Sequence, residues 1–392
     1  MSQYLNEERR QLVDALSRYL EREHRIPESG VATAEAPRRQ ELSAHWAAFT
    51  DFGLLGLSVD EQQGGIYDDP LSVYAVMEQF GRHLLREPYV STVVQGARLL
   101  VEVADVSSCA KAWLDQMFEG RSQVAVAHAE PQTDSCLHNV QTRAEQTGDT
   151  WRLSGHKVFV THAAQADIWL VLARTRGHVM DQDGLSLFAV DPQAEGIRCR
   201  AYCNLDGAPA AELWFDDVQV PAANLIGPVH QAWPMFAQAC ARTNVALCAE
   251  AVGIMSVVLE TTVDYVKARK QFGVTIGSFQ AIQHRLVDMY MQLEKARSLS
   301  LHASTVAGYG EVDVLFAATA AAKIVCCQSA RFISQNAIQL HGGIGMTDEL
   351  VLGQYVKRLM VIAQTLGDEQ HHIQQFIELT QAPRVNETAA QH

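Results

Sequence analysis

The chain has 392 residues, of which 48% are hydrophobic and 19% are charged, and its formal net charge is -14. This length exceeds one ordinary hydrophobic core and suits two or three domains. An acidic balance without a long basic run excludes a nucleic acid as the expected partner, because neutralising phosphates requires clustered Lys and Arg. The composition is compatible with an acidic redox protein that docks onto another protein.

The first ten residues lack the apolar core of a secretory signal, and we find no apolar run long enough to span a bilayer. We therefore expect a cytoplasmic protein without membrane insertion. Eight cysteines in so long a chain do not make a disulfide framework. No CxxC pair occurs, so buried free thiols are favoured over metal ligation, and we expect no metal site.

The amino-terminal block reads as helix. Leu12, Leu16 and Leu20 recur at spacings of four, and further apolar residues continue the pattern from Trp46 onward. The composition changes near Arg121. We therefore predict a helical domain over residues 1–121.

The middle block, residues 122–228, consists of short β-rich runs cut by prolines. The runs that read as strands are residues 158–160, 168–172, 185–190 and 212–215. This spacing favours a small antiparallel sandwich or barrel over a βαβ nucleotide-binding fold. No strand is followed by G-x-G-x-x-G, which removes the usual argument for a dinucleotide-binding sheet.

The remaining chain returns to helix, in stretches near residues 235–268, 281–308, 313–340 and 348–381. Ile282, Leu286, Met289 and Leu293 recur at spacings of three and four, a pattern typical of packed bundle helices. We predict a helical bundle over residues 229–381 and a polar, frayed tail at residues 382–392. The chain as a whole is expected to be mainly α with a central β domain.

Glycine rather than proline interrupts these helices, in two segments. The first runs from Arg269 to Gly273 and leads into Gln280, and the second is Gln-Leu-His-Gly-Gly-Ile-Gly at residues 339–345. Glycine lets the backbone approach a ligand closely. A cation, amide side chains and open backbone suit a cofactor that contains a pyrophosphate.

Both segments resemble the acyl-CoA dehydrogenase flavoprotein family, and the resemblance extends over nearly the whole chain. It implies a helical domain, a middle β-barrel or sandwich and a four-helix bundle, in that order. It also implies an oxidoreductase of lipid catabolism that uses FAD to desaturate an acyl-CoA thioester and passes electrons to an electron-transfer flavoprotein. In this family the loop after Arg269 reaches the FAD of a neighbouring subunit, so we expect a homo- or hetero-oligomer, either a dimer or a tetramer.

Carried over residue by residue, the resemblance assigns flavin contacts to four parts of the chain. They are Arg269, Gln271, Phe272 and Gln280 in the first segment, Gln339, Gly342 and Gly343 in the second, Ser135, Phe159 and Thr161 in the middle block, and Gln370 near the end. Alone, Arg269 would read as a solvated helix-end cation and Gly342-Gly343 as an ordinary helix end. The match at several fixed spacings favours the flavin.

The loop that contains Ser135 departs from the family's T-E-P-x-x-G-S-D pattern. Ala129, Asp134 and Cys136 replace its threonine, glycine and aspartate, while Glu130 and Ser135 are kept. A flavin contact by Ser135 is therefore evenly balanced against an ordinary turn serine.

The catalytic base is where the chain departs most from the family. Members abstract the proton alpha to the thioester with a glutamate, at one of two positions. These positions are Leu366 and Thr243 here, and the arginine that usually follows the second one is Asn244. Loss of the base together with its charged neighbour points to a changed role. In residues 247–253 and 367–372 the chain most resembles the small-subunit group of pimeloyl-CoA dehydrogenase. Heteromeric members of the family pair a base-bearing chain with a base-less one.

Two carboxylates are candidates for a displaced base. Glu250 lies about two turns beyond Thr243 on nearly the same helix face, at ~3.6 residues per turn, and Asp368 lies just beyond Leu366. Each reads more readily as a solvated or structural acid. His341, His371 and His372 are further titrating groups, and the pair of adjacent histidines reads as surface.

Three functions remain open. The first is an FAD-dependent acyl-CoA dehydrogenase subunit, and the second is a non-catalytic structural subunit that completes the flavin site of a base-bearing partner. The third is a member of the family that uses bound flavin to oxygenate its substrate, and no residue of the sequence directly indicates this function.

Overall fold

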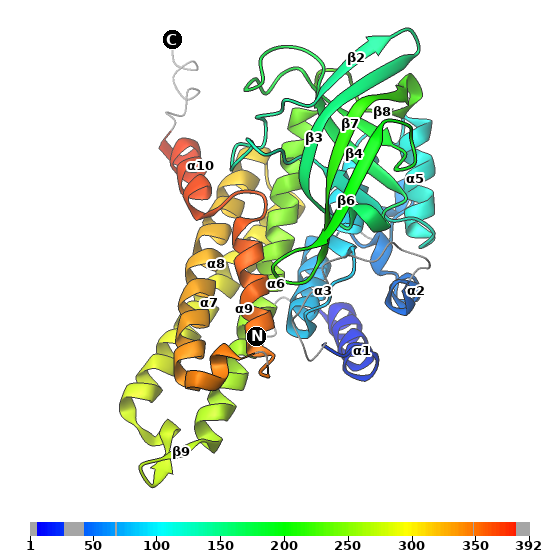
Figure 1. Cartoon of the computed structure of the whole chain (residues 1–392). Helices are drawn as coiled ribbons and strands as arrows, with labels where there is room; N and C mark the ends of the chain where they lie inside the picture. The colour runs from blue at the N-terminus through cyan, green and yellow to red at the C-terminus, as the bar shows by residue number, and fades with distance from the viewer. Residues whose placement is uncertain (1–5, 27–42, 67–68, 348, 382–392) are drawn as a thin grey trace, which may run out of the picture.

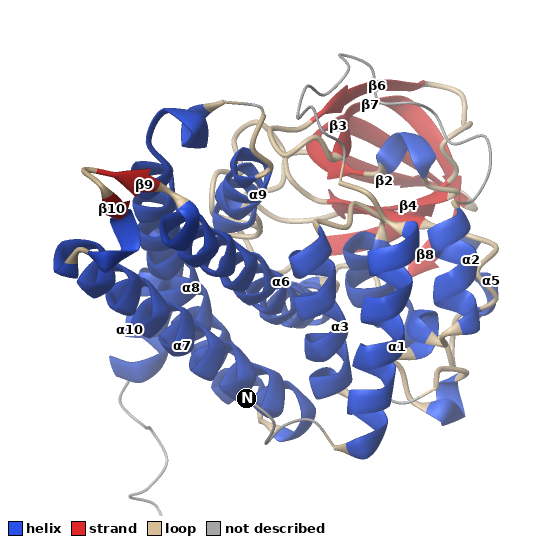
Figure 2. Ribbon diagram, turned by 90° about the horizontal axis from the view of Figure 1, so that it is seen from below, coloured by secondary structure: helices blue, strands red, loops and turns tan. Residues whose placement is uncertain are grey.

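A computed structural model describes residues 6–26, 43–66, 69–347 and 349–381. The polar tail predicted at residues 382–392 lies outside this range. Figure 2 shows the large sheet on one side of the molecule and the long helices α6, α7 and α8, with the small β9–β10 hairpin, on the other.

The amino-terminal part is helical, as predicted. Its elements are α1 (Glu7–Glu23), α2 (Ala44–Asp51), α3 (Pro70–His83), a π-helix (Val90–Gly96), α4 (Ala97–Val101) and α5 (Ser108–Phe118). The side chains of Asn6 and Ser43 accept hydrogen bonds from the first turns of α1 and α2, which fixes where these helices begin. Leu16 and Leu20 of α1 are fully buried against Trp46, so the spacing of four marks the packed face.

The middle part is an eight-stranded sheet with the order β6-β7-β3-β2-β4-β5-β8, and β1 pairs with β4. The strands are β1 (Val124–Ala127), β2 (Arg143–Thr147), β3 (Thr150–Thr161), β4 (Ile168–Arg174), β5 (Leu185–Val190), β6 (Ile197–Cys203), β7 (Pro209–Pro221) and β8 (Leu225–Ile226). The predicted strands are all present. The sheet is mixed rather than wholly antiparallel, because the hairpin β2–β3 intervenes and returns β4 parallel to β1 and β2.

Strand β4 is buried on both faces. Ile168, Leu170 and Leu172 face a core shared with α4, α5 and the start of α6, while Trp169 and Val171 face a second core within the sheet. The alternation follows from the two-residue period of a strand. The sheet is thereby fixed to the helical parts by one of its own strands.

The carboxyl-terminal part contains α6 (Trp233–Ala268), α7 (Gln280–Tyr309), α8 (Val312–His341), α9 (Leu352–Gln364) and α10 (Glu369–Gln381). The prediction of one helix over residues 348–381 is wrong. Leu366 and Gly367 adopt positive φ angles of 53° and 101°, which end α9, and the Asp368 side chain accepts the backbone N–H of His371 to start α10.

Helices α6 and α8 are long and apolar enough to cross a membrane by length and composition, which corrects the expectation that no such run exists. The most apolar window of α6 is 83% buried inside the fold, and that of α8 is 50% buried. Helix α6 packs against α3, α7, α8 and α9. Contact on many sides accounts for its apolar composition.

Helices α3 and α6 cross through a reciprocal pair of glycines. A Cβ atom at Gly81 would lie 2.0 Å from the carbonyl oxygen of Glu250, and one at Gly253 would lie 2.0 Å from that of Glu78. Both neighbours are backbone atoms, so no side-chain rotation can make room. The two helices must therefore separate to accept a methyl group.

We expect Gly253→Ala to lower the free energy of unfolding by about 1 to 3 kcal/mol, because overpacking moves backbone. The matched control is Gly308→Ala in α7, where the nearest atoms to an added Cβ lie at 3.7 Å. That control should raise stability by ~0.5 to 1 kcal/mol through helix propensity. Urea denaturation measures both, and equal stabilities of the two variants would contradict the close crossing.

Candidate functional site

The predicted cofactor residues fall into two groups that lie far apart along α6. At the carboxyl end of α6, the ring of Tyr265 stacks on His341 with centroids 4.4 Å apart, and its hydroxyl donates to the His341 carbonyl oxygen at 3.3 Å. This contact brings the two glycine segments to the same end of the bundle. At the other end, Ser135 Oγ donates to Asp368 Oδ1 at 3.5 Å, which joins the middle-block loop to the α9–α10 turn.

The first glycine segment forms a hairpin of β9 (Lys270–Gln271) and β10 (Val274–Thr275) that projects beyond the bundle in Figure 1. Its two turn residues, Phe272 and Gly273, have φ angles of 55° and 83°, the pattern of a tight hairpin turn. The Phe272 side chain is 93% exposed. A large apolar side chain at the tip of an arm indicates a contact outside this chain.

The polar side chains of the first segment are also open to solvent. Arg269 follows the last residue of α6, Gln271 lies on β9 and Gln280 begins α7, and all three are exposed. They are therefore available to a partner beyond the chain.

The second segment offers bare backbone. Gly342 has φ 64° and ψ -141°, a conformation that only glycine adopts readily. Gly343 has no such conformation, and a Cβ atom at either position would meet nothing within 4 Å. Among the described residues, no contact therefore requires Gly343 to lack a side chain, whereas close approach of a phosphate group would require it. Gln339 is exposed one turn earlier on α8.

The second group lies where the sheet meets the bundle. Phe159 has φ 53° at a register shift in the β3–β7 pairing, and its side chain is 63% exposed. Thr161 ends β3 and is exposed, as is Gln370 in the first turn of α10. Ser135 is half-buried against Asp368.

A buried ion pair shapes the loop that carries Ser135. The Glu130 carboxylate accepts from Lys157 Nζ at 2.7 Å and from the backbone N–H groups of Gln141 and Thr142 at 2.8 and 3.0 Å. Burial opposes the charge on Glu130, but the Lys157 ammonium and these donors outweigh it and hold the pKa of Glu130 below its ordinary value. The loop is therefore anchored on its inner side.

Leu366 and Thr243, where the resemblance places the family's base, lie in a hydrogen-bonded network. Thr243 Oγ1 donates to the Ala239 carbonyl oxygen at 2.7 Å, within its own helix. Asn244 Nδ2 donates to the Leu366 carbonyl oxygen at 3.1 Å. The Leu366 side chain is buried in an apolar cluster, so neither position offers a proton acceptor on its side chain suited to a C–H bond.

Lys323 completes this network from α8. Its ammonium group is fully buried and donates to Asn244 Oδ1 at 3.0 Å and to the carbonyl oxygens of Ile362 and Thr365 at 2.7 and 2.8 Å. All three acceptors are neutral oxygens. Burial lowers the pKa of Lys323, because the charged form has lost its water. Lys323 thereby ties α8 to α6 and to the end of α9.

Both candidate acids are engaged. Arg358 Nε and Nη2 donate to the two oxygens of Glu250 at 2.5 and 2.8 Å, and Arg358 Nη1 donates to Asp206 Oδ2 at 2.8 Å. This bidentate guanidinium contact occupies both carboxylate oxygens of Glu250. Asp368 caps α10. The geometry thus favours structural roles for both.

The expectation that His371 and His372 lie on the surface is wrong. His372 is 3% exposed, and burial lowers its pKa to about 3. His371 is half-buried, and burial lowers its pKa as well. Helix α10 packs along α8, which turns this side of a polar helix inward. His341 is also buried, and its Nδ1–H donates to the Ala337 carbonyl oxygen at 2.9 Å.

Sequence reasoning did not find Lys323, Arg358 or the contact between Cys136 and His138. A lone lysine within an alanine-rich apolar stretch of α8 was the available signal for the first. Across the described residues, no group of three or more His, Cys, Asp or Glu side chains is arranged to hold a metal ion.

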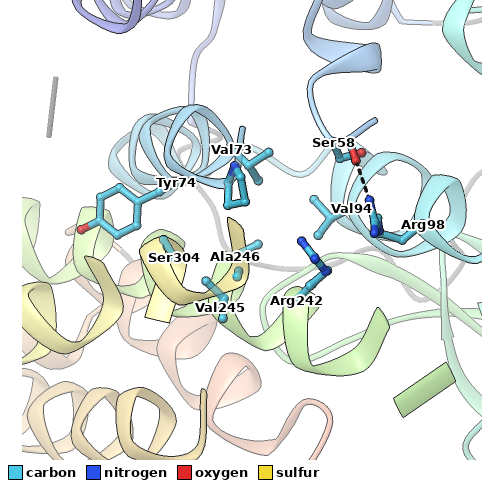
Figure 3. A pocket seen from close by; sticks show the side chains of 11 residues that line it. Ser58, Val73, Tyr74, Val94, Arg98, Arg242, Val245, Ala246 and Ser304 are labelled. Carbon is cyan, nitrogen blue, oxygen red and sulfur yellow. Dashed lines mark hydrogen bonds between the residues drawn. The ribbon is translucent and has the colours of Figure 1, made fainter. Parts of the chain in front are cut away.

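A separate pocket lies between α3, the π-helix, α6 and α7 (Figure 3). Arg242, Val245 and Ala246 contribute its α6 wall. Asn244 lies about 200° around the helix from Arg242 at ~100° per residue. The pocket is therefore on the opposite side of α6 from the Leu366 turn.

Models of the N-terminal, middle and C-terminal domains of acyl-CoA dehydrogenases match residues 6–119, 125–218 and 233–380. The chain is 30% identical to the L-prolyl-[peptidyl-carrier protein] dehydrogenase of Pseudomonas fluorescens, over 84% of this chain and 88% of that protein. It is 29% identical to the (2S)-methylsuccinyl-CoA dehydrogenase of Cereibacter sphaeroides, over 82% of this chain but only 60% of that longer protein.

The fold is that of solved acyl-CoA dehydrogenase structures. Butyryl-CoA dehydrogenase from Megasphaera elsdenii superimposes with a TM-score of 0.85 at 23% identity, covering 97% of this chain and 100% of that chain. The ChsE4-ChsE5 complex of Mycobacterium tuberculosis contributes a match with a TM-score of 0.81 at 21% identity, covering 97% and 99%.

We expect Lys323→Met to lower the free energy of unfolding by about 3 kcal/mol or more, since each stranded carbonyl or amide oxygen costs ~1 to 3 kcal/mol. Lys267→Met is the matched control, because Lys267 is exposed on the last turn of α6. Chemical denaturation of both variants gives the comparison, and equal effects would reject the role given to Lys323.

The pH dependence has a defined sign. The folded-state pKa of Lys323 lies below its ordinary value of 10.5. Between these two values the unfolded chain holds more protons, so the stability of the natural chain rises with pH. The stability deficit of Lys323→Met should therefore widen as pH rises toward about 10.5, as measured by denaturation at a series of alkaline pH values, and a deficit that narrows would contradict the assignment.

Proposed function

The chain belongs to the acyl-CoA dehydrogenase family, and on that premise we propose that it is an FAD-binding subunit of an enzyme that desaturates an acyl-CoA thioester. The observation that carries the proposal is the open backbone at Gly342-Gly343 beside the exposed Arg269 hairpin. Members of this family bind FAD, and these residues suit its diphosphate. When bound, FAD supplies a hydride acceptor.

We propose that the FAD site is composite. Asn244, beside the Leu366 turn, and Tyr265, beside the glycine segments, are about 32 Å apart along α6 at ~1.5 Å rise per residue. A site that uses both groups of residues takes one group from each of two chains. Arg269, Gln271, Gln280 and the second glycine segment would hold the cofactor of a neighbouring chain, while the sheet-side group would hold the chain's own.

Within its own site, the sheet-side group would orient the cofactor and the thioester. Thr161 and Ser135 offer hydroxyl groups, Phe159 offers an exposed ring, and Gln370 offers an amide beside them. The Glu130–Lys157 pair holds the loop, and Lys323 holds the facing turn. In this proposal the residues of this chain bind and orient the cofactor and the thioester and exclude water from them.

The base that removes the alpha proton is proposed to come from a homologous partner chain with its own complete site. Leu366 and Thr243 carry no acid, Glu250 is held by Arg358, and Asp368 caps α10. The competing account is a homomer in which Glu250 or Asp368 acts as a displaced base. A kinship with the small subunits of pimeloyl-CoA dehydrogenase is part of the same proposal.

The remaining assignments rest on the family. We place the domain boundaries near residues 121 and 228, with the bundle ending at residue 381. Electrons are proposed to pass to an electron-transfer flavoprotein, in a cytoplasmic, oligomeric enzyme of lipid catabolism. The net charge of -14 is compatible with docking onto a protein partner.

We expect Arg269→Ala to weaken FAD binding by roughly 10- to 150-fold, because losing a charged hydrogen bond costs about 1.5 to 3 kcal/mol. Lys267→Ala removes a nearby exposed cation and serves as the control. Flavin absorbance after gel filtration and titration of the apoprotein measure retention, and circular dichroism checks the helices. Unchanged flavin affinity in a folded Arg269→Ala protein would sink the assignment.

For the base, we expect the chain alone, loaded with FAD, to show little bleaching of flavin absorbance with a panel of acyl-CoA thioesters. Leu366→Glu should gain this reaction, because it places a carboxylate at the position of the family's base. Leu366→Gln should not gain it, because glutamine has the same length but carries no carboxylate. Adding a base-bearing homologue as a mixed oligomer should restore turnover.

Rapid flavin reduction by the unmodified chain, lost in Glu250→Gln or Asp368→Asn, would instead assign a displaced base within a homomer. Asp206→Asn is the control for Glu250→Gln, because it disturbs the same Arg358 cluster without changing Glu250. Equal losses of flavin reduction in Glu250→Gln and Asp206→Asn would mean that the Arg358 cluster supports the reaction by stabilising the fold, and not by supplying the base.

A further inference from the structure

A thiol and an imidazole meet on the loop that carries Ser135. Cys136 Sγ lies 3.3 Å from His138 Nε2, and both side chains are half-buried. The backbone N–H of Cys136 donates to the Thr133 carbonyl oxygen at 2.9 Å, and the Cys136 carbonyl oxygen accepts from the backbone N–H of Asn139 at 2.9 Å. The loop is hydrogen-bonded on both sides of Cys136, so the backbone holds the pair in place.

The imidazole is oriented by its surroundings. The His138 carbonyl oxygen accepts from Arg174 Nη2 at 3.0 Å, and its ring packs edge-on against Trp233 with centroids 5.1 Å apart. Burial and then the charges of Arg174 and His371 lower the pKa of His138. The ring is therefore neutral at pH 7, and a neutral imidazole nitrogen can accept the proton of the thiol that faces it.

The pair stands beside the turn that replaces the catalytic base. Its neighbour Ser135 contacts Asp368, and Leu137 packs against the apolar cluster that contains Leu366. The loop and the α9–α10 turn belong to different parts of the chain, so a substrate held between them would have the thiol on one side. The position of Cys136 in the family pattern is an aspartate, which is not a carbon nucleophile of comparable strength.

The chain contains its own reference thiols. All eight cysteines lie among the described residues, where none forms a disulfide bond, and Cys109, Cys199 and Cys203 are half-buried like Cys136. Cys109 Sγ faces an amide oxygen, that of Asn224, at 3.9 Å, and burial raises the pKa of its thiol. The remaining four are buried. The rates at which these thiols are alkylated provide the reference for an ordinary thiol of this protein.

We propose that Cys136 and His138 form a reactive thiol site that takes α,β-unsaturated thioesters, the product class of the proposed function, on which this inference rests. The Cys136 sulfur bonds to the beta carbon as its S–H bond breaks and His138 accepts the proton. The alpha carbon then takes a proton, so the adduct has the summed mass of protein and thioester. No oxidant or reductant is needed, and the product can inhibit its own enzyme by reversible addition.

The test uses the full chain loaded with FAD and crotonyl-CoA, an unsaturated thioester, with butyryl-CoA as the saturated control. Intact-mass spectrometry and peptide mapping should find one adduct, on Cys136, with crotonyl-CoA only. Cys136→Ser should abolish it. His138→Gln should slow it by roughly 100-fold at pH 7, since general-base catalysis contributes ~10² to 10⁴-fold.

A second arm uses iodoacetamide, which reports thiol reactivity without a thioester. Faster alkylation of Cys136 than of Cys109 and Cys203 is expected, again slowed in His138→Gln. Equal rates at all these thiols would overturn the proposal, as would rapid alkylation without any crotonyl-CoA adduct. Because the unsaturated thioester is supplied ready-made, this test does not depend on whether the chain dehydrogenates butyryl-CoA. A missing adduct therefore counts against this inference alone, whereas loss of FAD binding or of turnover in the mixed oligomer counts against the proposed function.

Discussion

An ammonium group sealed from water must find oxygen acceptors for its protons, and Lys323 takes them from Asn244, Ile362 and Thr365. One buried cation thereby fixes the end of α9 against two bundle helices. On α9 itself, Arg358 grips Glu250 of α6 and Asp206 of the loop between β6 and β7. Lys323 and Arg358 together fix the position of the turn around Leu366. Their contacts also hold the sheet, α6 and α9 in fixed positions relative to one another.

Helix α6 links every part of the proposed site. Its middle is clamped to α3 through Gly253, its amino-terminal half carries Asn244 beside the Leu366 turn, and its last turns carry Tyr265 beside the glycine segments. A straight helix cannot bring its two ends together. The proposed division of the cofactor residues between two chains therefore rests on the length of one helix, whose apolar composition reflects its contacts with α3, α7, α8 and α9.

Local sequence patterns predicted the strands, the buried helix face and the helix ends that depend on local interactions. Short β-rich runs between turns placed β4 and β5, spacings of four placed the buried face of α1, and the glycine segments marked the ends of α6 and α8. The break at Leu366 escaped prediction because a leucine at positive φ is held there by Asn244 and the surrounding apolar core, both distant in sequence. The parallel pairing of β1, the burial of His372 and the partners of Lys323 depend in the same way on tertiary contacts.

The exposed tip of the β9–β10 hairpin has a thermodynamic consequence. If cofactor residues are split between chains, association and cofactor binding are linked, and each must strengthen the other by the same free energy. Cofactor retention then depends on the concentration of chains as well as on that of FAD, by mass action. An aromatic ring left in water at Phe272 adds an apolar contribution to that linkage, which salt leaves largely intact while it screens the charge of Arg269. Dilution, more than ionic strength, is therefore the condition that empties such a site.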